Sequence, residues 1–256
     1  MMASKRAIPV ALCALLSSAC TLHLSGYSDS CDLTAARDAS LEVGDATRVR
    51  VTARAGALTI EGRPDLSEVR IAGTACAPSQ AELDRIELVT DRSGDDLLIE
   101  ARTEDTRGRL ALVIELPDSL VVDVDDSSGS IDVSDVAAVT LDDSSGSITI
   151  DRIAGDVRVR DESGSIDIRD VTGNVTVEDD GSGGIDIDGV EGNVTIEDDG
   201  SGGIDIRHVR QNVVVDEDGS GGIHVADIGG DFTVRRDGSG SIRHDRVDER
   251  VSTPSR

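Results

Sequence analysis

Aspartate, serine and glycine recur at fixed spacing in the C-terminal half of the sequence. An aspartate stands five residues before a recurring isoleucine, a serine three before it and a glycine two before it. In three regular copies these residues are Asp180, Ser182, Gly183, Asp199, Ser201, Gly202, Asp218, Ser220 and Gly221. An Asp carboxylate accepts a backbone N–H two residues on in an Asx turn. Glycine permits the positive φ of a sharp corner, and a serine hydroxyl bonds neighbouring backbone. We therefore interpret the repeated phrase as a structural turn.

The same aspartates also fit a second interpretation, which is calcium binding. Carboxylates stacked in neighbouring repeats repel one another, and a hard cation would relieve that repulsion. The phrase resembles the GGxGxDxUx nonapeptide of calcium-binding β-rolls. However, Asp186 stands between Ile185 and Ile187 and is therefore expected to face solvent. A calcium-dependent β-roll-like module stays an alternative, while we assign no metal ligand and no cofactor.

Histidines and paired carboxylates do not form a recognisable catalytic set. His208, His224 and His244 occupy different repeat positions and have no Ser or Cys partner at a familiar spacing. Carboxylate pairs are so frequent that they do not indicate glycosidase chemistry. Enzymes built on β-helices add long loops that form a cleft, whereas these repeats are uniform in length. We expect a non-enzyme, and a carbohydrate-active β-helix enzyme is an alternative.

These residues are positioned by a tandem repeat. The isoleucine anchors are spaced by 17, 18 and then four times 19 residues, and they are Ile131, Ile148, Ile166, Ile185, Ile204, Ile223 and Ile242. Tandem units of this size indicate a stacked array in which each unit contacts only its neighbours.

Each repeat predicts two short strands joined by tight turns. Ile185 and Ile187 alternate with a polar residue, and Val194 and Ile196 do the same. Near-constant unit length favours a coil in which each strand lies parallel on its counterpart about 4.8 Å away. The predicted fold is therefore an all-β parallel β-solenoid with about 19 residues per coil. One outward column would form an Asn-type ladder of Asp156, Asn174, Asn193, Asn212 and Asp231.

The chain before the repeats divides into three parts. Lys5 and Arg6 precede the apolar stretch AIPVALCALLSSA, so residues 1–19 are typical of a signal peptide. We expect residues 20–40 to form an N-terminal tether and 41–118 an irregular β entry region of the solenoid. The regular repeats then occupy 119–246, and 247–256 form a tail. The protein is thus expected to be exported, to the periplasm or the outer membrane.

The cysteines bear on how the chain is attached and cross-linked. The stretch LLSSAC resembles a bacterial lipobox, although Leu16 lies one position further back than usual. Cys20 would then be acylated and attach the chain to a membrane; the alternative is a soluble exported protein. With Cys20 acylated, Cys31 and Cys76 are left as a pair, for which we predict a disulfide.

Composition restricts the partners and the core. The 256 residues include 51 acidic and 25 basic ones, for a formal net charge of −26. Nucleic acid is excluded as a partner because phosphate binding needs a basic patch. The chain has one Tyr, one Phe and no Trp, so Ile, Val and Leu must build the core.

The run LALVIELPDSLVVDVDDSSGSIDVSDV at 110–136 resembles the entry to the bacterial β-strand-repeat putative adhesin family of unknown function. SGSIDV, SGSITI and SGGIDI match its sGxIxI units, and GDVRV, GNVTV and GNVTI match its GxVxV units, over about residues 45–245. The resemblance implies an exported parallel β-solenoid, and relatives are linked with envelope-stress signalling. We expect a non-catalytic, adhesin-like binding or scaffold protein of the cell envelope, whose partner is an envelope protein or a glycan. An accessory protein of envelope-stress signalling is a further alternative.

Overall fold

The computed structural model describes residues 31–103 and 106–254, so the predicted signal peptide and Cys20 lie outside the described residues. The elements before the regular repeats are β1 (Leu33–Ala36), β2 (Ala39–Glu42), β3 (Arg48–Thr52), β4 (Leu58–Arg63), β5 (Glu68–Ala77), α1 (Gln80–Leu83), β6 (Glu87–Ser93), β7 (Asp96–Arg102) and β8 (Arg109–Pro117). The strands that follow are β9 (Val121–Asp126), β10 (Gly129–Ser134), β11 (Ala138–Asp143), β12 (Gly146–Ile153), β13 (Val157–Asp161), β14 (Gly164–Val171), β15 (Val175–Asp180), β16 (Gly183–Val190), β17 (Val194–Asp199), β18 (Gly202–Val209), β19 (Val213–Ile228), β20 (Phe232–Val247) and β21 (Val251–Ser252).

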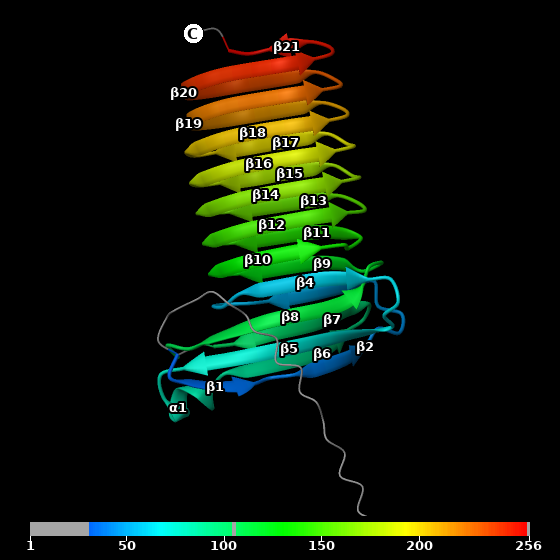
Figure 1. Ribbon diagram of the computed structural model, residues 1–256, viewed down its shortest axis with the longest axis vertical. Coiled ribbons are helices and arrows are strands. Elements are labelled where there is room, and N and C mark those ends of the chain that lie inside the picture. Colours follow the sequence, from blue (N-terminus) through cyan, green and yellow to red (C-terminus); the bar gives the residue numbers. More distant parts are fainter. Residues whose placement is uncertain (1–30, 104–105, 255–256) are drawn as a thin grey trace, which may run out of the picture. The chain divides into compact units, whose positions relative to one another are not determined.

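Each regular coil contributes one strand to each of two parallel stacks (Figure 1). One stack runs through β9, β11, β13, β15 and β17, and the other through β10, β12, β14, β16 and β18. β19 and β20 bend through both stacks. Ile185 pairs with Ile166 in the preceding coil and with Ile204 in the following one. This in-register parallel pairing confirms the predicted all-β parallel β-solenoid.

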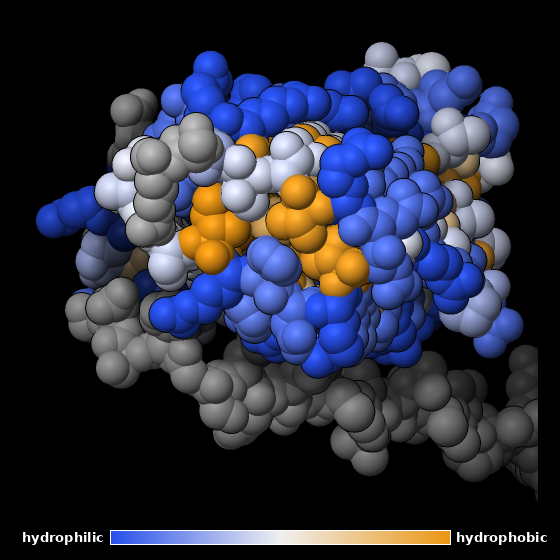
Figure 2. Space-filling model, turned by 90° about the horizontal axis from the view of Figure 1, so that it is seen from above, coloured by the Kyte–Doolittle hydropathy of each residue, from blue (hydrophilic) through white to orange (hydrophobic). Residues whose placement is uncertain are grey.

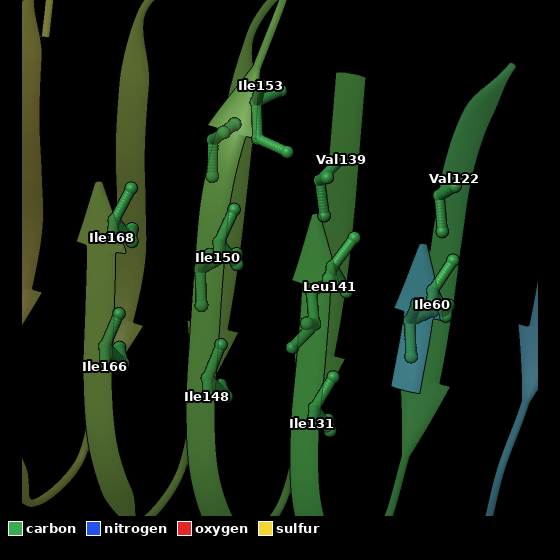
Figure 3. Close-up of a cluster of buried hydrophobic side chains, with 14 of the residues drawn as sticks. Ile60, Val122, Ile131, Val139, Leu141, Ile148, Ile150, Ile153, Ile166 and Ile168 are labelled. Atoms are coloured by element: carbon green, nitrogen blue, oxygen red, sulfur yellow. The ribbon is translucent and has the colours of Figure 1, made fainter. Parts of the chain in front are cut away.

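The core consists of columns of aliphatic side chains between the two stacks (Figure 3). Ile148 and Ile150 are fully buried, as are Ile166 and Ile168 in the next coil. Burying such a side chain contributes about 1.5–3 kcal/mol, and the same contribution recurs in every coil. Branched, compact side chains stack with little lateral space, so the narrow core needs few aromatic rings; Phe232 is buried near the C-terminal end.

Strands β3, β4, β7 and β8 also form parallel coils, but these coils are not stacked in chain order. β3 pairs in parallel with both β7 and β9, and β4 pairs in parallel with both β8 and β10. The coil formed by β3 and β4 therefore lies between the β7–β8 coil and the first regular coil. The sequence of this coil echoes the repeat, and Leu58 and Ile60 continue the core columns on Ile131 and Val133.

Antiparallel strands close the N-terminal end of the array. β5 pairs antiparallel with β8, β1 and β2, and β6 forms a hairpin with β7. The one-turn helix α1 is capped by Ser79, whose side chain accepts the N–H of Glu82. β1 and the start of β2 fall within residues 20–40, which we expected to form a tether. The backbone groups of both strands pair with β5.

At the C-terminal end, β20 is a charged strand edge. β21, which falls within the expected tail, pairs only with Phe232 and Thr233. The remainder of β20 carries Arg, His and Asp side chains, which oppose edge-to-edge association. Viewed from this end, apolar side chains lie in the middle of the cross-section and hydrophilic ones surround them (Figure 2). Ile242, Val247 and Val251 are partly buried against the core there.

Two adjacent glycines provide a direct test of coil stacking. A Cβ on Gly202 would lie 1.5 Å from the carbonyl oxygen of Gly183, whereas a Cβ on Gly203 would meet nothing closer than 3.9 Å. We expect Gly202→Ala to lower the free energy of unfolding by more than about 3 kcal/mol, because the coils must separate. Gly203→Ala should leave it unchanged or raise it by up to about 1 kcal/mol. Urea unfolding of both variants measures the difference, and equal effects would contradict the stacking contact.

Candidate binding surfaces

The aspartates of the repeated phrase form a buried column at one corner of the solenoid. Register pairs join each member to the next through adjacent coils, and the members are Asp126, Asp143, Asp161, Asp180, Asp199 and Asp218. Each of these residues has at most 3% of its surface exposed. We call these six residues the aspartate column.

Sequence reasoning assigned these aspartates to turns and missed their burial. Asp143 lies two residues after Leu141 and therefore on the same, inward side of its strand. In later coils an extra residue, Glu178, would reverse this parity, but a register shift in the pairing of β13 with β15 accommodates it. Asp180 therefore stays inward. The alternation Leu141, Asp143 in the shorter coils was the signal that could have revealed the burial.

Hydrogen bonding in the aspartate column varies along the array. Oδ1 of Asp143 accepts the N–H of Ser145 at 3.2 Å, and Oδ1 of Asp161 accepts that of Ser163 at 3.1 Å, which are Asx turns. Both carboxylate oxygens of Asp199 and of Asp218 meet no hydrogen-bond donor among the described residues. The turn interpretation thus describes Asp143 and Asp161, whereas Asp126 and Asp180 lack such a bond, as do Asp199 and Asp218.

Burial controls the acidity of this column. Desolvation raises the pKa of Asp126, Asp161 and Asp180 to about 6. The pKa of Asp199 is raised to about 7, first by burial and then by the neighbouring carboxylates Asp180 and Asp218. A buried carboxyl group without a cationic partner favours its neutral form.

The serines and first glycines of the phrase hold the turn through their backbone. The N–H of Gly183 donates to the carbonyl of Ser201 at 3.0 Å, and that of Gly164 donates to the carbonyl of Ser182 at 2.9 Å. Gly183, Gly202 and Gly221 have φ of 158–159°, close to extended backbone. Glycine is required mainly because a side chain would strike the carbonyl of the preceding coil. Ser220 and Gly221 pair in register with the matching residues of β20.

The glycines directly before the isoleucine anchors have more open surroundings than the glycines that precede them. Gly184, Gly203 and Gly222 face open space, since a Cβ at each would meet no atom closer than 3.7 Å. Register partners of this row in other coils carry a side chain, as Ser165 and Ser241 do. Three successive coils therefore lack a side chain that the fold would accept. The result is a shallow trough of about 400 Å³ on the outer face of β16, β18 and β19, which we call the glycine trough.

A row of carboxylates borders the glycine trough. Asp167, Asp186 and Asp205 occupy the same register position in adjacent coils, and His224 continues the row. Asp167 and Asp205 side chains are 31% and 33% exposed and pair with Arg169 and Arg207 on their own strands. The trough thus combines bare backbone with hydrogen-bond acceptors repeated at about 4.8 Å.

A second groove follows the predicted amide ladder. Nδ2 of Asn193 donates to Oδ1 of Asn174 at 3.1 Å, and Nδ2 of Asn212 donates to Oδ1 of Asn193 at 2.9 Å. The neighbouring row contains Thr176, Thr195 and other small side chains. The amide groups satisfy one another along the array, so this ladder stabilises the stacking.

A third groove follows the row of turn residues whose backbone φ is positive. Six non-glycine residues adopt φ of 50–59° there, and they are Asp135, Arg152, Asp170, His208, Asp227 and Arg246. Opposite charges in this row pair: Arg152 contacts Asp135 at 2.7 Å, and Arg246 contacts Asp227. Left-handed backbone costs such residues about 1–2 kcal/mol each. No sequence signal beyond Gly189, at φ 77°, indicated this conformation.

The three repeat-region histidines have different contacts. Nδ1 of His208 is 2.6 Å from Asp188, while Nδ1 of His224 is 3.3 Å from Asp205. The ring of His244 lies 6.4 Å from that of Phe232. In residues 31–103 and 106–254, no group of three or more His, Cys, Asp or Glu is arranged to hold a metal ion.

Cys31 and Cys76, which we predicted to pair, lie at the N-terminal end of the solenoid. Their Cα atoms are 5.7 Å apart, a normal separation for a disulfide, and the structure joins their sulfur atoms. Cys76 belongs to β5, and Cys31 lies just before β1, which pairs with β5. Backbone pairing therefore brings the two cysteines together.

Comparison with known proteins gives similar folds. No protein-family model and no curated protein matches the sequence. The chain is similar to solved structures of putative adhesins. One from Bacteroides fragilis is 10% identical with a TM-score of 0.36 and covers 87% of this chain and 98% of its own. One from Parabacteroides distasonis is 12% identical with a TM-score of 0.37, covering 82% and 97%.

A putative lipid-binding protein from Parabacteroides distasonis is also similar, at 14% identity and a TM-score of 0.36, covering 87% of this chain and 97% of its own. Across the described part of the chain, no helix has the length and hydrophobicity to span a membrane.

The disulfide can be tested without changing the sequence. A Cys31–Cys76 bond closes a loop across a separation of 45 residues. We expect reduction to lower the free energy of unfolding by about 2–4 kcal/mol, because the unfolded chain regains entropy. Denaturation with and without reductant measures this, and a non-reducing peptide map should contain the cross-linked peptide. Detection of both thiols free in exported protein would contradict the prediction.

Proposed function

We propose that this chain is a non-catalytic binding module of the cell envelope that holds a repetitive neutral glycan on the glycine trough. The observation that carries the proposal is periodicity: the trough and its carboxylate row repeat once per coil on a flat strand face. A polymer with repeating units meets the same contact several times on such a face. Several weak contacts made together give useful avidity.

The chemistry of the trough fits a sugar better than a charged polymer. A pyranose ring has an apolar face that packs on bare peptide, and its hydroxyls donate hydrogen bonds to carboxylates such as Asp186. Asp167 and Asp205 keep about a third of their side-chain surface exposed for such bonds. The formal net charge of −26 repels anionic polymers, so a neutral glycan is favoured.

A non-catalytic role follows from the openness of these surfaces. The described grooves lie on strand faces or corners and are open to solvent. Catalysis by carboxylates or histidine needs groups held together where water is excluded. His208 and His224 instead contact Asp188 and Asp205 in separate rows.

Attachment to the envelope would come from Cys20, which lies outside the described residues. We propose that a lipid on Cys20 anchors the exported chain and leaves the solenoid free to bind. Intact-mass analysis of the exported protein, with Cys20→Ser as the control, tests this. A mature mass that shows an unmodified Cys20 would exclude the anchor.

The glycine trough can be filled with a side chain that the fold already accepts. In the variant Gly184→Ser/Gly203→Ser/Gly222→Ser, each site carries the residue found in the same row at Ser165 and Ser241. We expect the variant to fold normally and to bind glycan at least about tenfold more weakly. Binding is measured on an array of neutral and charged bacterial oligosaccharides.

A matched control changes the other groove. Thr176→Val/Thr195→Val copies Val214, which occupies that row in the next coil, and should bind like the wild type. Equal glycan binding by the triple serine variant and the wild type would contradict the assignment of the binding site to the glycine trough. Failure of the wild type to bind any glycan on the array would contradict the function.

A further inference from the structure

The aspartate column presents an electrostatic problem that the binding surface does not explain. Asp180, Asp199 and Asp218 occupy adjacent coils in register, and each is at least 98% buried. Their carboxylate oxygens meet no hydrogen-bond donor among the described residues. Ionised carboxylates stacked about 4.8 Å apart away from water repel one another strongly.

The charged groups around these three residues do not neutralise them. Asp161 and Asp237 continue the column at either end, and Asp179 and Asp198 lie beside it. The nearby cations on neighbouring strands are engaged elsewhere: Arg160 contacts Glu178 at 2.9 Å, and Arg236 contacts Glu217. The column is therefore surrounded by further carboxylates.

The amide ladder of the same protein shows that stacked side chains of this shape bond to one another when each can donate and accept a hydrogen bond. Asn174, Asn193 and Asn212 bond along the array because each amide donates through Nδ2 and accepts through Oδ1. A carboxylate only accepts, whereas a protonated carboxyl group both donates and accepts. Asp199 and Asp218 are register partners in adjacent coils, so a proton on one carboxyl group would have the other as its acceptor.

We propose that the aspartate column is a proton-sharing ladder, in which protons held between carboxyl groups of adjacent coils bond the coils together. When the ladder is protonated, the coils are hydrogen-bonded to one another at this corner. Loss of the shared protons places like charges in register and loosens the corner. The column is thus an acid-stabilised device built into the solenoid, separate from the glycine trough.

The direction of the pH effect follows from the pKa values. Folded-state pKa values of about 6 for Asp180 and about 7 for Asp199 lie above the ordinary 3.8. The folded state therefore binds these protons more tightly than the unfolded chain. The stability that they contribute is fully present below about pH 4 and is lost progressively as the pH rises from there through the folded-state pKa values of about 6 and about 7.

The test compares two triple substitutions in the same coils. Asp180→Asn/Asp199→Asn/Asp218→Asn gives the column amides that bond without extra protons. Asp179→Asn/Asp198→Asn/Glu217→Gln removes the same number of charges from the adjacent outer positions. Urea midpoints are measured from about pH 4 to about pH 8 for both variants and the wild type.

We expect the wild-type and outer-variant midpoints to fall as the pH rises from about 4 to about 7. The midpoint of the column variant should fall by a smaller amount, because Asp126 and Asp161 still have raised pKa values. Infrared spectra should show a protonated-carboxyl band in wild type at pH 6 that persists in the outer variant and is weakened in the column variant. This spectrum of the wild type decides the matter even if the column variant does not fold. A wild-type midpoint that does not change with pH would overturn the proposal, and so would the absence of a protonated-carboxyl band. Stabilisation of the wild type by added calcium, with loss of that band, would also overturn it.

Discussion

The structure depends on parallel backbone stacking in strict register. Each inner coil of the regular repeats hydrogen-bonds to the coil before it and the coil after it, so equivalent residues of successive repeats lie directly on one another. The close approach of Gly202 to the carbonyl of Gly183 shows how little space separates successive turns. A one-residue slip would exchange inward and outward faces and destroy the core.

In-register stacking places equivalent side chains of successive coils in columns. Each column is stable only if its neighbouring side chains interact favourably with one another. Aliphatic columns gain by it, since Ile148 on Ile166 buries apolar surface on both sides. Amide columns also gain, because Asn193 both donates and accepts. In one surface row opposite charges of neighbouring coils pair, as Arg152 and Asp135 do. A buried column of identical acids is stable only if protons or a bound cation offset the repulsion, which is why the aspartates stand out.

Much of the architecture was readable from the sequence, because period and parity are local properties. The anchors and their spacing predicted the coil, and the alternation around Ile185 predicted which side faces the core. The insertion of the β3–β4 coil between β8 and β10 was not predictable, since Leu58 pairs with residues distant in the chain. The burial of Asp180 was missed because the register shift at Glu178 hides its parity. The glycine trough emerged only when the space around Gly184 and Gly203 could be compared with that around Gly183 and Gly202.

The central claim is that equivalent strands of successive coils lie parallel and in register. Nuclear Overhauser contacts between the backbone and methyl groups of labelled Ile185 and Ile204 test it most directly. The account predicts strong contacts for this pair, and equally for Ile166 with Ile185, in the pattern of parallel strands. Contacts that instead join Ile187 to Val194 as an antiparallel hairpin would contradict it.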